Sequence, residues 1–440
     1  MSNERSGFSS RLGFVLATAG SAVGLGNIWR FPYLAAKYGG GTFLLTYLIL
    51  TLTFGFSLMI TEVALGRKAG TSAIRAFGHF SKKHTFIGYL TTIIPFIIFP
   101  YYCVIGGWVT KYALVSLQGG IHNAASDTFF TGFISKSAEP MICVLVFLIA
   151  TTVVVAGGVK GGVERVSTIM MPVLIVLLIG VSLFCITRPG AMAGVAYYLK
   201  PSLKGFGPTT ILAALGQLFY SMSLAMGIMI TFGSYMPKKA DLEKSVTQVE
   251  IFDTGVAFLA GLMIVPAVFV FSNGDSSMLA KGPSLMFVML PKVFDSMAFS
   301  SVIAAVFFIL VLLAALTSSI SLLETLVAVL MDKFHMKRGT ACITMFIIAL
   351  LLAVPSSLGF DFLDFFDFIS NSVLMPIAAF LTCLFVGYII KPKVIVDEVE
   401  SSGKFKRKSL FLIMVKYIAP ICIVAILVFS VLEGLGFITV

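Results

Sequence analysis

The sequence predicts an all-α protein that crosses a membrane many times, and three observations support this prediction. The mean hydropathy of the 440 residues is +1.02, and 58% of them are hydrophobic. Only 12% are charged, whereas a soluble globular protein carries about 25% charged residues. Apolar runs of about 20 residues, long enough for a helix to cross a bilayer, recur along the whole chain. We therefore expect one membrane domain and no soluble domain.

Eleven apolar runs are long enough to be spans. Their approximate limits are 11–36, 41–66, 86–116, 139–157, 165–187, 208–236, 246–272, 298–331, 339–356, 361–390 and 409–437. Several exceed the ~20 residues that cross a bilayer, so these helices are expected to tilt, kink or extend beyond it.

Lysine and arginine are distributed unevenly between the two sides of this arrangement. The segments on the side of the N-terminus hold about three times as many as the segments on the other side, and such an excess marks the cytoplasmic side. The N-terminus is therefore expected in the cytoplasm and the C-terminus outside the cell. The net charge of +11 is a topology signal on this interpretation. We expect a multi-pass protein of the cell membrane, partnered by the lipid bilayer and by no nucleic acid.

Two of the spans are interrupted in their middle by small and polar residues. The stretch ATAGSAVGLGNIWRFP (17–32) contains three glycines together with Ser21, Asn27 and Arg30. The stretch GQLFYSMSLAMGIMITFGSY (216–235) has a similar small and polar centre. Close helix packing is the better explanation of one such stretch alone. Two of them, at matching positions in two five-helix halves, indicate an inverted-repeat transporter with a binding site at mid-membrane.

An unwound helix in a membrane leaves backbone groups that need partners. A bound cation can accept the freed carbonyl oxygens as ligands, and the N-terminus of a half-helix can bind an anion. A broken helix therefore offers one site that holds a cation and a carboxylate together.

Four motifs resemble those of the neurotransmitter:sodium symporters (solute carrier 6-like). They are GSAVGLGNIWRFPY in the first span, YGGG at 38–41, GQLFYSMSLAMG in the sixth span and AALTSSIS at 314–321. The resemblance is to the prokaryotic amino-acid branch, typified by the bacterial leucine transporter, and covers spans one to ten. It implies a leucine-transporter-like fold of two inverted five-helix repeats, 11–187 and 208–390, with helices 1 and 6 broken. The span 409–437 is then an additional, eleventh helix.

The resemblance implies two sodium sites. The first is assigned to the Ala22 carbonyl, Asn27, Ser221 and Asp253, completed by the carboxylate of the substrate. The second is assigned to the carbonyls of Gly20, Val23 and Ala314 and to the hydroxyls of Thr317 and Ser318. Oxygen ligands suit a hard cation such as sodium. Taken alone, the hydroxyls of the LTSS stretch are better explained by hydrogen bonds to their own helix.

The resemblance also implies a binding pocket for an amino acid. Gly24 leaves room for the carboxylate, to which Tyr102 is expected to donate its hydroxyl hydrogen. The rest of the expected pocket consists of Ala22, Gly26, Ile98, Ile105, Tyr220, Ser221, Ser223, Ala225, Met226, Ser318 and Leu322. These residues are apolar apart from a few hydroxyls, which favours a neutral, hydrophobic substrate. Alanine, a branched aliphatic and an aromatic amino acid all remain open.

Asp253 stands where the most familiar form of the first sodium site has an asparagine. Relatives that use chloride place that anion nearby to balance the sodium charge, and they place a hydroxyl where this chain has Ala257. An acid costs about 2.5–3.5 kcal/mol at the middle of a membrane helix, so Asp253 is expected to be paired with an ion or a proton. We expect transport that does not depend on chloride.

Charged residues near the two ends of the site are expected to form gates. Arg30 and Asp367 are expected to pair in the outer vestibule, with Tyr220 as an aromatic lid. Arg5 and Asp332 are expected to pair at the inner face, beside Tyr235. Glu62 is expected to have a structural role, bracing the unwound part of the first helix.

The leading hypothesis is therefore a secondary transporter that carries a neutral amino acid into the cell with sodium, by alternating access. One alternative is coupling to protons held by Asp253 or Glu62, and another is a non-transporting receptor with the same fold. An enzyme is not expected, because the chain has no HExxH pair and its four histidines lie in predicted loops. No organic cofactor is expected. The preferred amino acid, the sodium stoichiometry and the oligomeric state are left open.

Overall fold

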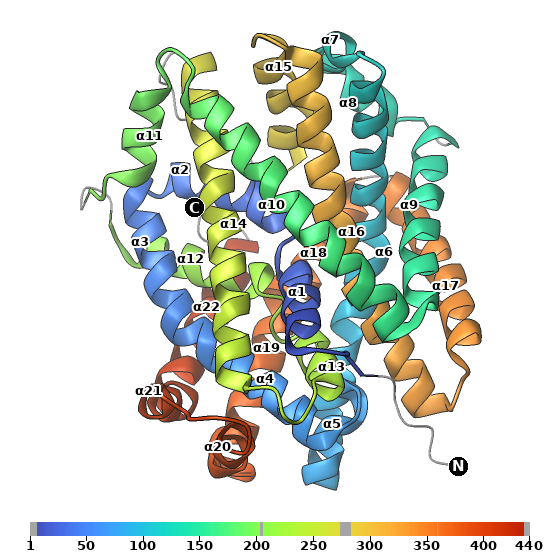
Figure 1. Cartoon of the computed structure of the whole chain (residues 1–440), viewed down its shortest axis with the longest axis vertical. Helices are drawn as coiled ribbons and strands as arrows, with labels where there is room; N and C mark the ends of the chain where they lie inside the picture. The colour runs from blue at the N-terminus through green and yellow to red at the C-terminus, as the bar shows by residue number, and fades with distance from the viewer. Residues whose placement is uncertain (1–6, 137, 203–205, 273–282, 359, 435–440) are drawn as a thin grey trace.

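A computed structural model describes residues 7–136, 138–202, 206–272, 283–358 and 360–434. Within these ranges the chain is helical and contains no strand, which confirms the predicted all-α class. Most helices run roughly along the long axis of the molecule (Figure 1). Two of them, α6 (Thr85–Leu117) and α16 (Ser300–Phe334), pack along each other in the interior.

Nine continuous helical stretches in the described residues are long and apolar enough to cross a membrane. They are Gly41–Ala69 (α3, Gly41–Leu50; η2, Thr51–Gly55; α4, Phe56–Ala69), Lys82–Leu117 (η3, Lys82–His84; α6), Ala138–Ala156 (α9), Val159–Ile186 (η4, Val159–Glu164; α10, Arg165–Ile186), Leu242–Phe271 (α14), Ser300–Phe334 (α16), Arg338–Ser357 (most of α17, Arg338–Leu358), Phe362–Ile389 (most of α18, Phe360–Asp367; η7, Phe368–Leu374; α19, Met375–Leu384; η8, Phe385–Ile389) and Lys408–Leu432 (α21, Lys408–Ile413; η9, Met414–Ile418; most of α22, Ala419–Gly434). Each falls on a predicted span.

The first predicted span consists of two helical pieces. These are α1 (Arg11–Ala22) and a second piece formed by η1 (Gly26–Arg30) and α2 (Phe31–Lys37), bent by 56° from the first. Counted as one span, this pair is the tenth candidate in the described residues. The predicted break in helix 1 therefore lies at residues 23–25.

The sixth predicted span is also divided into two helices, and the break between them is longer. It consists of α12 (Pro208–Ser221) and α13 (Ile228–Tyr235), and neither piece alone is long enough to count as a span. The predicted total of eleven spans is therefore not confirmed, although the predicted interruption of this segment is observed. Between the two pieces, Ser223, Ala225 and Gly227 have φ angles of 52°, 62° and 71°. Such left-handed backbone ends a helix, and it disfavours residues with a side chain.

Small residues allow the broken helices to approach their neighbours closely. A Cβ atom added to Gly66 on α4 (Phe56–Ala69) would lie 1.8 Å from the carbonyl oxygen of Ile230 on α13. A Cβ added to Gly233 on α13 would lie 2.3 Å from the carbonyl oxygen of Val63. Helices in membranes associate through such close backbone contacts. Because these two glycines have no side chain, α13 can pack with its backbone directly against α4.

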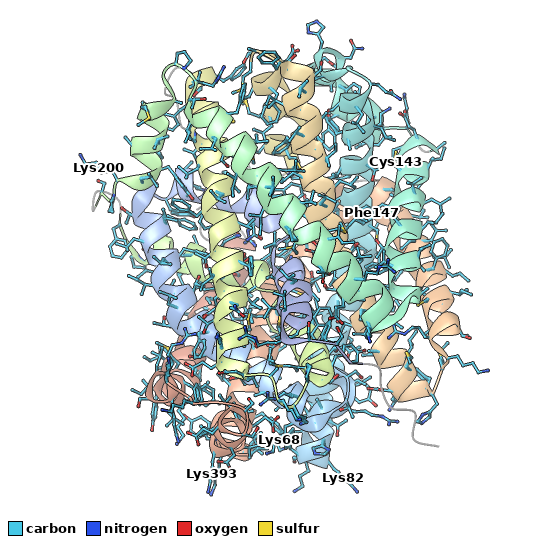
Figure 2. The ribbon with its side chains drawn as sticks, viewed as in Figure 1. Lys68, Lys82, Cys143, Phe147, Lys200 and Lys393 are labelled. Atoms are coloured by element: carbon cyan, nitrogen blue, oxygen red, sulfur yellow. The ribbon has the colours of Figure 1, made fainter. Side chains whose placement is uncertain are left out.

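Short helices cover the two ends of the bundle. One end carries α7 (Ile121–Ala124), α8 (Asp127–Ile134), α11 (Ala191–Leu199) and α15 (Leu290–Asp295), which follows η6 (Leu285–Met289). The other carries α5 (Ala73–Phe80) and α20 (Lys393–Glu400), and Figure 2 shows Lys68, Lys82 and Lys393 at this end. The end with α5 and α20 is the one predicted to face the cytoplasm.

The segment that contains α20 is attached to the bundle through a buried ion pair. Arg67 at the end of α4 has no exposed side-chain surface, and its Nε lies 2.8 Å from Oε1 of Glu398. The guanidinium also donates to the carbonyl of Ala240 and the hydroxyl of Ser402, at 2.8 and 3.0 Å. Because the arginine is buried, its charge depends on Glu398 for compensation.

Replacing Glu398 by alanine is therefore expected to destabilise the protein by about 3 kcal/mol, because Arg67 is left as a buried, unpaired cation. The matched control is Glu400→Ala on the same helix. Glu400 pairs with Lys408 at 2.8 Å, but both side chains are 43% exposed, so the expected loss is under about 1 kcal/mol. Thermal unfolding of both purified variants in detergent measures the difference, and equal shifts would contradict the prediction.

Candidate binding site at the two helix breaks

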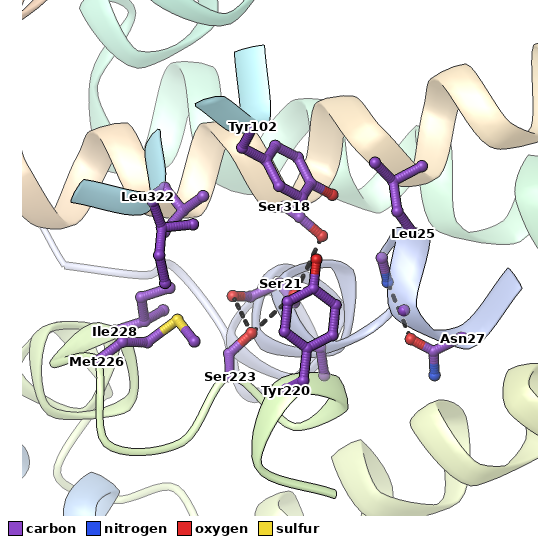
Figure 3. Close-up of a pocket in the computed structure, with 14 residues that line it drawn as sticks. Ser21, Leu25, Asn27, Tyr102, Tyr220, Ser223, Met226, Ile228, Ser318 and Leu322 are labelled. Atoms are coloured by element: carbon purple, nitrogen blue, oxygen red, sulfur yellow. Dashed lines mark hydrogen bonds between the residues drawn. The ribbon is translucent and has the colours of Figure 1, made fainter. Parts of the chain in front are cut away.

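A small cavity of about 30 Å³ lies where the two breaks face each other. Its lining residues come from α1, η1, α6, α12, α13 and α16, and Figure 3 shows the labelled side chains converging on it. They are Ser21, Ala22, Gly24, Leu25, Gly26, Asn27, Ile98, Tyr102, Tyr220, Ser223, Met226, Ile228, Ser318 and Leu322. Elements from both halves of the chain thus build one site.

The C-terminal end of α1 presents a group of oxygen atoms to α16. The hydroxyl of Ser318 lies 3.5, 3.2 and 3.4 Å from the carbonyl oxygens of Gly20, Ser21 and Val23. The Ser21 carbonyl also accepts from the Ser223 hydroxyl at 2.9 Å, which leaves the carbonyls of Gly20 and Val23 facing the one hydrogen that Ser318 can donate. The carbonyl ends of a helix also carry partial negative charge. Together these features make a place that favours a cation.

Asp253 on α14 (Leu242–Phe271) forms a second group of oxygen atoms. Its Oδ1 accepts hydrogen bonds from Nδ2 of Asn27 at 2.7 Å and from the Ser221 hydroxyl at 2.8 Å. Its Oδ2 accepts from the Tyr47 hydroxyl at 3.1 Å. Asp253 is fully buried, and no lysine, arginine or histidine pairs with it among the described residues. A buried carboxylate with neutral partners alone needs a cation or a proton.

An orphan hydroxyl points into the space between these groups. Tyr102 is 4% exposed, and its hydroxyl forms no hydrogen bond within the described residues although it lies beside Ser318 and Leu25. A Cβ atom added to Gly24 would lie 2.7 Å from the Ser318 hydroxyl and 3.3 Å from the Tyr102 hydroxyl. The glycine thus keeps open a space that two hydroxyl groups face. Such a buried, unpaired donor is suited to a ligand with an acceptor oxygen.

Comparisons with known proteins agree with this geometry. The model of the sodium:neurotransmitter symporter family matches residues 5–132 and 130–435. The chain belongs to the sodium:neurotransmitter symporter family. A sodium-dependent transporter of Bacillus subtilis, YhdH, is 34% identical over 95% of this chain and 96% of its own length. The human sodium- and chloride-dependent GABA transporter 2 is 25% identical over 98% of this chain and 80% of its own.

The fold is also that of a solved transporter. The crystal structure of MhsT in complex with L-phenylalanine superimposes with a TM-score of 0.87 at 37% identity, covering 97% of this chain and all of that one. The predicted leucine-transporter-like fold and the prediction that the protein is not an enzyme are therefore confirmed. The symporter depends on sodium, as its family does. The division into repeats and the roles of individual residues stay predictions.

Most of the residues expected in the symporter's pocket line the cavity, and three lie elsewhere. Ile105 lines the outer vestibule instead, and Ser221 contacts Asp253. Ala225 is outside the lining, and its N–H donates to Oε1 of Glu62 at 2.8 Å. The sequence interpretation missed Ser21, Leu25 and Ile228 as lining residues, and it missed Tyr47 beside Asp253. Tyr47 lies on α3 (Gly41–Leu50), where no motif marks it.

The expected ligands of the second sodium site are brought together in part. The carbonyls of Gly20 and Val23 face Ser318. The Thr317 hydroxyl instead donates to the carbonyls of Leu313 and Ala314 on its own helix, at 3.1 and 3.0 Å. This is the hydrogen bonding to the same helix that the sequence alone favoured for these hydroxyls.

The expectation that Glu62 braces the first break is wrong. Its Oε1 accepts from the N–H of Ala225, in the break between α12 and α13. The first break is braced by Gln217, which donates from Nε2 to the Gly26 carbonyl at 3.0 Å. It is also closed locally by Asn27, whose Oδ1 accepts from the N–H of Gly24 at 3.1 Å. Each break is therefore supported by a helix outside its own half of the chain.

The outer gate lies beside a vestibule of about 670 Å³. Tyr220 lines both the vestibule and the central cavity, so its ring separates them, as expected of a lid. Arg30 and Asp367 both line the vestibule, but no ion pair joins them in the described residues. The Arg30 guanidinium lies over the Tyr220 ring at 5.5 Å, and Asp367 accepts from Asn371 at 2.6 Å. Arg30 and Asp367 thus both face the vestibule, and the ion pair expected between them is not formed in the described structure.

The inner gate is only partly within the described residues, because Arg5 lies outside them. Asp332 accepts hydrogen bonds from the N–H and hydroxyl of Ser72, at 2.8 and 2.5 Å. Tyr235 donates its hydroxyl hydrogen to Glu324 at 2.8 Å. Glu324 is fully buried and receives two hydrogen bonds from Arg338, at 2.6 and 2.9 Å. Tyr235 therefore belongs to a closed, charged network toward the end of the molecule that is predicted to face the cytoplasm.

Gly24→Ala is expected to weaken sodium binding by about tenfold or more, because the new Cβ displaces the Ser318 hydroxyl and overpacking costs about 1–3 kcal/mol. Gly180→Ala on α10 (Arg165–Ile186) is the matched control, since a Cβ there meets nothing within 4 Å. Binding of radioactive sodium to the purified variants measures the effect. Unchanged binding in Gly24→Ala would show that this space is not part of the ion site.

Proposed function

We propose that this symporter carries a neutral, hydrophobic amino acid into the cell together with sodium. The observation that carries the proposal is Asp253, a fully buried carboxylate with only neutral hydrogen-bond partners in the described residues. It lies beside the break in the first span, where carbonyl oxygens outnumber hydrogen-bond donors. Both features need positive charge, and together they support two sodium sites.

The first sodium site is proposed at Asp253, Asn27 and Ser221, with the Ala22 carbonyl and the substrate carboxylate. Ser221 already contacts Asp253, and Ala22 lines the cavity beside it. Asn27 faces Asp253 with its amide nitrogen, so its Oδ1, which now accepts from the N–H of Gly24, would have to turn toward the ion to serve as a ligand. The second is proposed at Ser318 with the carbonyls of Gly20 and Val23, supported by their distances of 3.5 and 3.4 Å. Thr317 and Ala314 would join it once the hydrogen bond between them opens. The donor atoms are all oxygen, which fits sodium.

The substrate is proposed to bind with its carboxylate at Gly24 and Tyr102. The tyrosine hydroxyl is an unpaired donor there, and the glycine leaves the space open. Ile98, Met226 and Leu322 line the cavity with apolar side chains, and none of the described residues that line it is charged. This lining favours a neutral, hydrophobic amino acid. MhsT binds L-phenylalanine, which supports an aromatic or large aliphatic substrate. The cavity of about 30 Å³ would have to widen to hold such a side chain, for example by movement of the flexible Met226 side chain.

Transport is proposed to be independent of chloride. The human relative is a sodium- and chloride-dependent transporter. In this chain Asp253 supplies a fixed negative charge where the first sodium is proposed, so a chloride ion is not needed to balance that sodium. Ala257, one helical turn further on α14, offers no hydroxyl to an anion.

The direction of transport follows from the proposed topology. Lys68, Lys82 and Lys393 lie at the same end of the molecule as α5 and α20, and excess lysine and arginine marks the cytoplasmic side. The N-terminus is then cytoplasmic, and the large vestibule lined by Tyr220 opens to the outside. Sodium entering from outside would reach the site through this vestibule.

Tyr102→Phe is expected to leave folding intact and to weaken amino-acid binding by at least about tenfold. No hydrogen bond of the folded protein is lost, since the hydroxyl has no partner among the described residues, but a bound carboxylate loses one donor worth about 1.5–3 kcal/mol. Tyr198→Phe is the control, because its hydroxyl bonds the Phe258 carbonyl away from the cavity. Calorimetric titration of both variants with L-phenylalanine and L-leucine, alongside thermal melting, separates binding from stability. Wild-type affinity in Tyr102→Phe would remove the residue from the site.

Uptake into proteoliposomes tests the proposed function as a whole. Labelled amino acids should enter only when sodium is present outside, and replacing sodium by choline should abolish uptake. Replacing chloride by gluconate should leave it unchanged. Competition by each of the twenty amino acids then identifies the substrate, which we expect among the neutral hydrophobic ones. Uptake in sodium-free medium at acid pH would support proton coupling instead, and binding without uptake would support a receptor.

A further inference from the structure

We infer that Arg407, at the start of the last membrane helix, sets the electrostatic environment of the first sodium site by neutralising a second buried acid, Glu250. This inference rests on the proposed function, because it takes Asp253 as a sodium ligand. It makes Arg407 a positioning residue for sodium, acting through α14 rather than touching the ion. It also gives the helix outside the two proposed repeats a part in ion binding.

Glu250 lies three residues before Asp253 on α14. Residues with this spacing are neighbours on one helix face, with Cβ atoms about 5–6 Å apart. The side chain of Glu250 is 1% exposed. Its Oε2 accepts a hydrogen bond from Arg407 at 3.0 Å, while Oε1 has no partner within the described residues. Two carboxylates are thus buried one turn apart, and only one of them has a basic partner.

Arg407 is held in place from several sides. Its guanidinium lies 3.2 Å from the centre of the Phe56 ring on α4, and it also donates to the Thr247 hydroxyl. Its own N–H donates to Oε1 of Glu243 at 3.1 Å. Only 23% of its side chain is exposed. The arginine precedes α21 (Lys408–Ile413), so it links the last span to α4 and α14.

The charged groups near Arg407 come from α14 and from the neighbouring residues of its own segment. Glu243 and Glu250 face it from α14, at 3.6 and 3.0 Å. The neighbouring Lys406 contacts Glu243 through its backbone N–H. Lys408 pairs with Glu400 at 2.8 Å and does not face α14. Arg407 is therefore the cationic side chain that pairs with Glu250 in the described part of the chain.

The sign of the effect on sodium follows from Coulomb's law. Removing the negative charge of Glu250 leaves the nearby arginine less compensated and makes the potential at Asp253 more positive, so a cation binds less tightly. Removing Arg407 makes the potential more negative, so sodium binds more tightly. A unit charge about 10 Å away, at an effective dielectric constant near 20, changes affinity on the order of tenfold. Loss of packing would instead weaken binding in both cases.

The experiment measures the half-saturating concentration of radioactive sodium for the purified full-length protein in detergent. Glu250→Gln is expected to raise this concentration about three- to tenfold. Arg407→Gln is expected to lower it, and an unchanged value in a folded variant would overturn the inference. The double variant removes one charge of each sign, so its value should return to within about twofold of the wild type. If Arg407→Gln does not fold, Glu250→Gln and the double variant still decide the question.

Lys408→Gln is the matched control, because it removes the same charge one residue further along the chain but from a side chain that pairs with Glu400. It should leave sodium binding unchanged. The inference is overturned if both single variants weaken sodium binding, if Glu250→Gln has no effect, or if the double variant is no better than the worse single one. A wild-type protein that binds no sodium would instead reject the proposed function, so the two failures can be told apart.

Discussion

The constraint on which this structure depends is that backbone polar groups at mid-membrane cannot be left without partners. An unpaired amide costs roughly 2–7 kcal/mol in an apolar environment. The two breaks expose such groups, and other helices supply side chains to them. Gln217 donates to the Gly26 carbonyl, and Glu62 accepts from the Ala225 N–H. At the end of α1 there are fewer donors than carbonyls, since Ser223 donates to the Ser21 carbonyl and the Ser318 hydroxyl alone faces those of Gly20 and Val23. The surplus of oxygen there creates the demand for a cation.

The same surplus gives a physical basis for coupling between sodium and an amino acid. A carboxylate entering the space beside Gly24 and Tyr102 brings negative charge into a site that already holds the buried Asp253. Without cations that charge is repelled, and with them it is attracted. If both ligands bind as proposed, each must raise the affinity of the other by the same factor, because the coupling free energy is shared. This coupling between sodium and substrate requires no conformational change, only charges that lie close together in a region of low dielectric constant.

The backbone chemistry of the breaks is predictable from the sequence, whereas much of what surrounds them is not. Two interrupted spans at matching positions predict the breaks from the residues alone, whereas Gly24 and Ser318 are assigned through the family resemblance, and both line the cavity. Ile105 is misplaced because it lies seven residues beyond Ile98 on α6, which is about 10 Å along the axis. That distance moves it into the vestibule. Tyr47 carries no local signal, since only folding brings it to Asp253.

The two sides of the cavity are closed very differently, and this difference bears on the direction in which the site opens. On the vestibule side the Tyr220 ring separates the cavity from a space of about 670 Å³. On the other side, which is proposed to face the cytoplasm, Tyr235 joins an ion pair between the fully buried Glu324 and the partly buried Arg338, and Phe8 packs against Tyr235. Moving one ring breaks few contacts, but inward opening must separate a buried ion pair or move it as a unit. Because separating this pair would leave the fully buried Glu324 carboxylate without its cation, this side is the more strongly closed of the two in this conformation. A ligand shifts such an equilibrium only by its difference in affinity for the two states, so cations at Asp253 and at the carbonyls of α1 would favour opening toward the proposed cytoplasmic side only if they bind that open state more tightly.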